Sequence, residues 1–198
     1  MRRNGLPILA IFLFACCSTA YAQDCPSAAT VSRGFVVERG DKQRTEVFVG
    51  DDGLVRTRMR YGGQSLLETT LFAGLLPLDR FDRGRRTTST PLTDLKTLFP
   101  LRVGQKVLAR FTYSDGSLTI PTTIQLFVKG TEQIAIGPCN YTVLKIEHSE
   151  GRGEGGMLRL VSTDYYAPDL KLVLMKEYKE IDGRSTFVKF DKIYPVAP

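Results

Sequence analysis

Few residues in this chain have the chemistry of a catalytic group. His148 is the only histidine among the 198 residues, and it lies in an extended stretch beside Glu147, just before Ser149 and Glu150. No serine stands in a Gly-x-Ser-x-Gly turn, the usual setting of a hydrolase nucleophile. We therefore expect His148 to face solvent near the end of a strand. A Ser-His-Asp triad built on it is the weaker alternative.

The carboxylates and the glycine-rich stretches also give no sign of a catalytic site. Asp51, Asp52 and Asp164 fit turns and strand ends better than a catalytic carboxylate pair. With one histidine, a transition-metal site would need carboxylates almost alone. The glycine-rich residues 153–156 lack the Lys-Ser/Thr that follows a phosphate-binding loop. The sequence thus predicts no catalytic residue, no metal and no cofactor, and a protein that is not an enzyme.

Arginines form the most promising pattern. Arg56, Arg58 and Arg60 alternate with other residues, so on a strand their guanidinium groups share one face. Three like charges need compensation from cross-strand acids such as Glu46 and Glu68, from solvent, or from an anionic ligand. A second cluster lies in a loop-like stretch and comprises Arg80, Arg83, Arg85 and Arg86. These seven arginines are candidates for binding phosphate or carboxylate groups, and a solvated strand face is the alternative.

Only two cysteines, Cys25 and Cys139, lie beyond residue 22. An even pair in an oxidising compartment predicts one disulfide. A redox-active pair would more usually form Cys-x-x-Cys, which the chain lacks. We therefore expect this bridge to act as a structural staple.

Residues 1–22 have the features of a cleaved signal peptide. A basic start is followed by an apolar run over residues 6–17 and by Ala20-Tyr21-Ala22, a small-x-small cleavage site. An apolar run of about a dozen residues is short of the roughly 20 that cross a bilayer as a helix. We expect a periplasmic protein that begins at Gln23 and has no transmembrane segment; a lipid anchor at Cys16 is the alternative. Such a protein rarely meets nucleic acid, so its basic residues point to lipids, anionic polymers or proteins.

Period-two alternation dominates the rest of the chain and is punctuated by Asp-Gly and Gly-Gly turns. The expected strands are residues 30–39, 45–49, 54–61, 64–72, 107–113, 118–129, 133–136, 141–148, 157–165, 170–181 and 185–194. One short helix is expected over residues 93–99, with Thr93 as its N-cap and Pro100 as its stop.

Strands joined so tightly must be mostly antiparallel. Residues 23–198 are therefore predicted to form a single β domain, an antiparallel meander of ten or eleven strands curled into an open or closed β-barrel. Its apolar face either fills the interior or lines a cavity that holds an acyl chain.

Three stretches resemble landmarks of uncharacterised bacterial envelope proteins. They are residues 99–105 (Phe-Pro-Leu-Arg-Val-Gly-Gln), residues 137–146, which begin Gly-Pro-Cys-Asn-Tyr, and residues 163–170, which contain Tyr-Tyr-Ala-Pro and run on to Lys176-Glu177. The resemblance covers residues 93–192. It implies an all-β fold similar to the curved, incompletely closed sheet of Lol-type lipoprotein carriers, and it brings no catalytic residues.

These observations predict a periplasmic, non-enzymatic binding or envelope-maintenance protein. We expect it to hold a lipid or other amphiphile on the concave face of its sheet, with the arginines near the mouth. One alternative is an interaction protein that docks on anionic envelope polymer or on a partner protein without a pocket ligand. An envelope hydrolase that uses His148 or a carboxylate is the weaker alternative.

Overall fold

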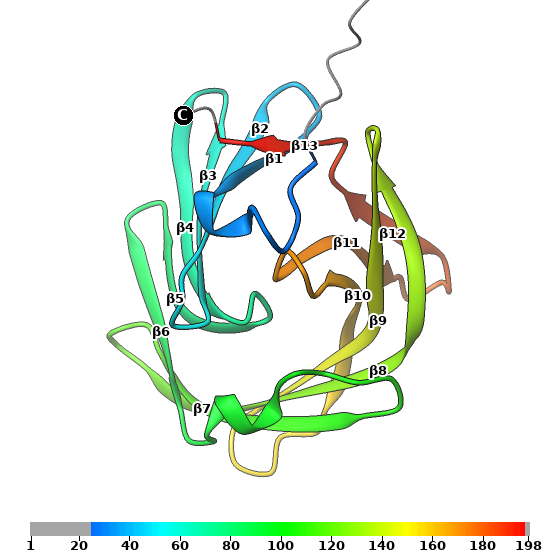
Figure 1. Ribbon diagram of the computed structural model, residues 1–198. Coiled ribbons are helices and arrows are strands. Elements are labelled where there is room, and N and C mark those ends of the chain that lie inside the picture. The colour runs from blue at the N-terminus through cyan, green and yellow to red at the C-terminus, as the bar shows by residue number, and fades with distance from the viewer. Residues whose placement is uncertain (1–24, 197–198) are drawn as a thin grey trace, which may run out of the picture.

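A computed structural model describes residues 25–196, which form one antiparallel sheet of thirteen strands (Figure 1). The strands are β1 (Phe35–Arg39), β2 (Gln43–Val49), β3 (Leu54–Tyr61), β4 (Gln64–Phe72), β5 (Leu76–Asp82), β6 (Arg85–Pro91), β7 (Lys106–Ser114), β8 (Thr119–Ile136), β9 (Cys139–Arg152), β10 (Arg159–Ala167), β11 (Leu172–Lys179), β12 (Ser185–Lys189) and β13 (Lys192–Pro195). Two short 3-10 helices, η1 (Val31–Arg33) and η2 (Leu95–Leu98), complete the fold. The predicted signal peptide, Cys16 and Gln23 lie outside the described residues. No helix within residues 25–196 is long and apolar enough to cross a membrane.

The predicted meander is confirmed, because the strands follow one another in the sheet from β12 back to β1. β13 then pairs with the far side of β1, so β12 and β13 form the two edges. Only Phe190 and Asp191 separate these two strands along the chain, yet no β ladder joins them. The sheet is therefore curled but not closed.

Some elements differ from their predicted form. Residues 76–91, which include the predicted arginine loop, are the hairpin β5–β6. Their strands are rich in Arg, Asp and Thr and lack the apolar alternation that marks a strand in the sequence. The predicted helix is the 3-10 helix η2, and its N-cap is Asp94 rather than Thr93, since the Asp94 side chain accepts a hydrogen bond from the backbone N–H of Lys96.

Two hydrophobic cores hold the curled sheet together. The first joins β1–β3 to β9–β11, and the second joins β7–β9 to the η2 segment. Neighbouring residues of one strand enter different cores: Val143 and Tyr165 pack in the first, Leu144 and Tyr166 in the second. Because successive strand residues point to opposite faces, the middle of β9 and β10 is covered on both sides.

The β4–β5 turn crosses the interior and meets the β10–β11 turn near the centre of Figure 1. There the Tyr166 hydroxyl donates a hydrogen bond of 2.8 Å to the carbonyl oxygen of Ala73. Gly74 has a φ of +72°, and a Cβ at this position would lie only 1.7 Å from the carbonyl oxygen of Lys171. Glycine is therefore required where the two turns touch.

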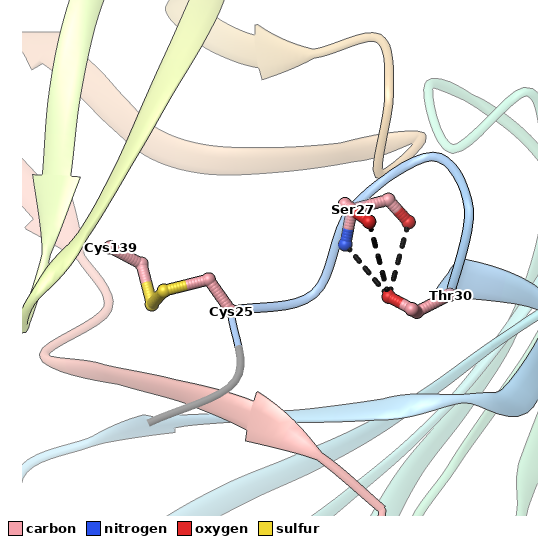
Figure 2. The surroundings of a disulfide bond; sticks show 4 residues. All are labelled: Cys25, Ser27, Thr30 and Cys139. Carbon is pink, nitrogen blue, oxygen red and sulfur yellow. Dashed lines mark hydrogen bonds between the residues drawn. A yellow bond between two sulfur atoms is a disulfide. The ribbon is translucent and has the colours of Figure 1, made fainter. Parts of the chain in front are cut away.

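The disulfide predicted between Cys25 and Cys139 is present, with Cα atoms 5.7 Å apart (Figure 2). It ties the segment before η1 to the first residue of β9. Beside it, the Ser27 backbone N–H donates to the Thr30 hydroxyl at 2.9 Å, which shapes the turn that leads into η1 (Figure 2). The bridge thus fixes the start of the described chain to the β8–β9 turn.

Candidate functional site

The inner face of the sheet carries the candidate site. We use this name for the face on which Phe111 of β7, Ile124 of β8 and Ile146 of β9 contribute to the second core, and the outer face is the opposite one. On β9–β11 the inner face also carries a polar cluster, which joins the buried residues His148, Ser162 and Asp164 to the half-buried residues Glu150 and Lys176. Strand register brings them together, because Ser162 pairs with His148 and Asp164 pairs with Lys176.

Asp164 is the centre of the polar cluster and is only 1% exposed. The Ser162 hydroxyl donates to its Oδ1 at 2.6 Å, and the Lys176 ammonium donates to its Oδ2 at 3.0 Å. His148 Nδ1 lies 3.3 Å from the same Oδ2. A buried carboxylate needs such partners, since an uncompensated charge in the interior is costly.

His148 connects Asp164 to Glu150. Its Nε2 lies 3.4 Å from Glu150 Oε1 and makes no hydrogen bond within residues 25–196. Glu150 Oε2 in turn lies 3.8 Å from the Arg152 guanidinium. The row of charges therefore runs from buried Asp164 to exposed Arg152.

The pKa shifts in this row have a common origin. Burial by itself would lower the pKa of His148, but its contacts with Asp164 and Glu150 outweigh burial and raise the pKa above 6.5. Burial would raise the pKa of Asp164, but the contact with His148 and the charge of Lys176 lower it below its usual value. The contact with His148 also lowers the pKa of Glu150, against the effect of burial. The two carboxylates thus favour the charged form of His148, and the charge of Lys176 acts against it.

Two predictions about these residues were wrong. His148 was expected to face solvent but is 7% exposed, and Asp164 was assigned to a strand end or turn but lies buried in the middle of β10. Their partners belong to different strands, so the spacing along the chain did not reveal them. The arrangement also differs from a Ser-His-Asp triad, because Ser162 donates to Asp164 and not to His148.

A cavity of about 320 Å³ opens on the inner face beside the polar cluster. Phe111 and Ile124 form buried apolar parts of its wall. The full lining comprises Pro77, Asp79, Arg80, Thr87, Ser89, Phe111, Tyr113, Thr122, Ile124, Glu150 and Arg152. We call it the inner-face cavity; it combines an apolar wall with a few charged groups, as small-molecule sites do.

Two cations reach the inner-face cavity from different strands. Arg80 comes from β5 and pairs with Asp82, while Arg152 comes from the end of β9. The Arg152 guanidinium also lies 6.0 Å from the centre of the Tyr113 ring, a cation–π contact across the cavity lining. The sequence did not indicate Arg152, because its place depends on how far β9 extends.

The seven predicted anion-binding arginines do not form one site. Arg56, Arg58 and Arg60 occupy alternate positions of β3 and share the outer face. Arg56 pairs with Asp52 at 3.2 Å and Arg58 with Glu68 at 2.8 Å. Arg60 makes no ion pair with a described residue.

Three of the other four arginines, Arg80, Arg83 and Arg85, line one hollow of about 350 Å³ on the β5–β6 hairpin, together with Asp82. Arg80 also lines the inner-face cavity, and Arg86 joins Arg56 and Arg58 in an outer-face groove of about 420 Å³. Arg83 lies in the turn with a φ of +48°, and Arg85 lies 3.9 Å from Asp115 of the neighbouring hairpin turn. For all seven residues, anion binding remains a prediction.

Residues 25–196 contain no group of three or more His, Cys, Asp or Glu side chains that could hold a metal ion.

No family profile matches this sequence, and no curated protein is similar enough to count as a relative. Among solved structures, the chain is similar to the hypothetical lipoprotein YmcC from Escherichia coli K12, at 12% sequence identity and a TM-score of 0.47. The match covers 79% of this chain and 86% of that one. A likeness of this strength carries no conclusion about family, ligand or location, so the function must rest on the geometry of the site itself.

Proposed function

We propose that this protein is a non-enzymatic binding protein of the bacterial cell envelope that holds an amphiphile in the inner-face cavity. The composition of the cavity carries the proposal. Its apolar wall, with Phe111 and Ile124, suits a hydrocarbon body, while Arg152, which lies 3.8 Å from Glu150, suits an anionic head group. Its volume of about 320 Å³ lies within the range of small-molecule sites.

The disulfide supports an envelope location. A bridge between Cys25 and Cys139 is expected to persist in an oxidising compartment, and the signal peptide predicted over residues 1–22 leads to one. We therefore propose the periplasm as the place of action.

The polar cluster supports a binding rather than a catalytic role. Ser162 is 1% exposed and donates to Asp164, so neither group is presented to a substrate. The Asp164 carboxylate already has three partners, the side chains of His148, Ser162 and Lys176, which all belong to strands of the sheet. We propose that the cluster stiffens the wall of the cavity and sets its charge.

Docking on an anionic polymer through the outer face has less support. Arg56, Arg58 and Arg86 each have a carboxylate partner within 3.2 Å, so the charge of the outer-face groove is largely balanced. An anionic polymer would have to replace these partners before it gained from the arginines.

The proposal can be tested by filling the cavity. Ser89 is half-buried in the cavity lining, whereas its neighbour Thr88 is exposed on the outer face. We expect a dansyl-labelled fatty acid to bind the wild-type protein, and S89F to weaken that binding at least tenfold. T88F is the matched control and should bind like the wild type.

Analysis of co-purifying molecules complements this titration. Native mass spectrometry and solvent extraction of gently purified protein should reveal a bound amphiphile that S89F no longer carries. Absence of any bound amphiphile, together with no binding of the dansyl probe, would contradict the proposal. Equal binding by S89F and the wild type would place the ligand elsewhere.

A further inference from the structure

The tip of the β9–β10 hairpin carries the longest run of exposed apolar residues within residues 25–196. Residues 157–161 are all exposed, and four of the five are apolar: Met157 at 73%, Leu158 at 36%, Leu160 at 46% and Val161 at 42%. We call residues 152–161 the finger. Single apolar residues are ordinary on protein surfaces, but several exposed apolar residues close together usually mark an interaction site.

The apolar residues lie in both parts of the finger. Met157 and Leu158 belong to the loop before β10, whereas Leu160 and Val161 lie in β10 at the bulge between Leu160 and Ser162. This segment projects from the lower edge of the molecule in Figure 1. The head-group and upper acyl region of a bilayer surrounds a projecting segment and offers it both an apolar boundary and phosphates.

The backbone is tightly packed where the finger joins the sheet. A Cβ on Gly156 would lie 2.1 Å from the carbonyl oxygen of Arg152, and one on Gly151 would lie 2.5 Å from the carbonyl oxygen of Gly156. Gly153 N–H also donates a hydrogen bond of 2.8 Å to the carbonyl oxygen of Pro121 in β8. These contacts anchor the yellow loop that projects from the lower edge of the molecule in Figure 1.

Two arginines belong to the finger: Arg152 precedes the apolar residues and Arg159 lies among them. Arg152 is 3.8 Å from Glu150, and Arg159 makes no ion pair with any described residue. Arg58 on the outer face, by contrast, is 2.8 Å from Glu68. Guanidinium groups without a close carboxylate are free to bind lipid phosphates, although Glu154 in the same loop reduces the net charge.

We propose that the finger inserts into the head-group region of an anionic phospholipid bilayer. Met157, Leu158, Leu160 and Val161 enter the apolar boundary while Arg152 and Arg159 bind phosphates above it. Because Arg152 also lines the inner-face cavity, this contact places the mouth of the cavity beside the membrane. The insertion does not require an occupied cavity, so it goes beyond the proposed function.

A tryptophan reporter tests the insertion directly, because the chain contains no tryptophan. In M157W, we expect a blue shift of the emission and quenching by brominated lipids when vesicles of phosphatidylglycerol and phosphatidylcholine are added. Added salt should weaken the response, since it screens the arginine–phosphate attraction. L92W is the matched control: Leu92 is 66% exposed but lies beyond β6, away from the finger.

Surface variants separate insertion from other contacts. L158S combined with L160S should lower partitioning into the anionic vesicles at least tenfold, and R159Q should lower it several-fold. L92S combined with V103S should have no effect. S89F, which fills the cavity, should leave vesicle binding intact, so failure of the binding function and failure of insertion can be told apart.

Three outcomes would overturn the proposal. One is an emission of M157W that stays unchanged at saturating lipid. Another is an equal response of M157W and L92W. The third is concentration-dependent self-association that L158S with L160S abolishes while vesicle binding is absent, because the finger would then be a protein interface.

Discussion

At the residue scale, Asp164 balances the charges of His148, which is buried, and of Lys176, which is half-buried. It is 1% exposed and accepts hydrogen bonds from Ser162 and Lys176 beside its contact with His148. We predict that D164N destabilises the fold by about 3 kcal/mol, the scale on which loss of one partner leaves a buried charge unpaired. Urea unfolding measures this change.

The control for D164N is D52N, which removes one partner of the exposed pair with Arg56. This variant should leave the free energy of unfolding nearly unchanged, because surface pairs contribute little. If the two variants unfold at the same urea concentration, Asp164 does not have the role assigned to it.

His148 makes the stability of the fold depend on pH. Its pKa is raised above 6.5 in the folded protein, so its contribution is fully present below pH 6.5 and is lost as the pH rises through the folded pKa. Asp164 has a lowered pKa, so its contribution is present above about pH 3.8 and is lost as the pH falls through the folded pKa. We predict that stability declines above pH 6.5 in the wild type.

The variant H148Q should remove most of this decline. Since His148 is the only histidine of the chain, unfolding curves between pH 5 and pH 9 report mainly on it. Parallel declines in the wild type and H148Q would assign the pH dependence to another group.

The sequence allowed some of these residues to be placed, but not the polar cluster. The spacing of Arg56, Arg58 and Arg60 was sufficient to put them on one face. The partners of His148 depend on how β10 pairs with β9, and a bulge between Leu160 and Ser162 shifts that register. A shift of one residue changes which side chains face the interior, so alternation alone could not bring Ser162 to His148.

At the element scale, the hairpins that were predicted are those with apolar alternation and a glycine-containing turn. β3 and β4 were predicted with the bounds they have in the structure. β5 and β6 were missed, because their pairing depends on neighbouring strands rather than on an apolar face of their own. This hairpin contributes Arg80, Thr87 and Ser89 to the inner-face cavity, so one side of the site was also missed.

The contact between the β4–β5 and β10–β11 turns gives a prediction at this scale. G74A places a methyl group against the carbonyl oxygen of Lys171 and also strains a positive φ. We predict a loss of stability of more than about 3 kcal/mol, above the usual cost of backbone strain alone.

Gly84 in the β5–β6 turn provides the matched control. Its φ is +86°, but a Cβ there would have no neighbour within 4 Å. G84A should therefore cost only about 1–2 kcal/mol, the penalty of the left-handed backbone. Thermal or urea unfolding of both variants measures the difference, and equal losses would show that the contact with Lys171 is unimportant.

At the scale of the whole molecule, the curled sheet gives its two faces different chemistry. The inner face carries the apolar side chains of the second core and the polar cluster. The outer face over β3–β6 carries arginines that form ion pairs with carboxylates. The number of strands and their tight turns predicted a curled meander, since a flat sheet would expose long edges. Closure could not be predicted, because it depends on where β12 and β13 end relative to each other.

This distribution of charge predicts where the molecule binds anions. Replacement of Arg56, Arg58 and Arg60 by Gln should leave binding to anionic vesicles unchanged within error, because two of these arginines are already paired and all three lie on the outer face. R152Q combined with R159Q should weaken the same binding several-fold, because these two arginines are the cations of the finger. Vesicle co-sedimentation at low salt measures both, where exposed charges act most strongly. If the triple variant lost as much binding as the double variant, the anion site would lie on the outer face, and the finger would not be the point at which this molecule meets a membrane.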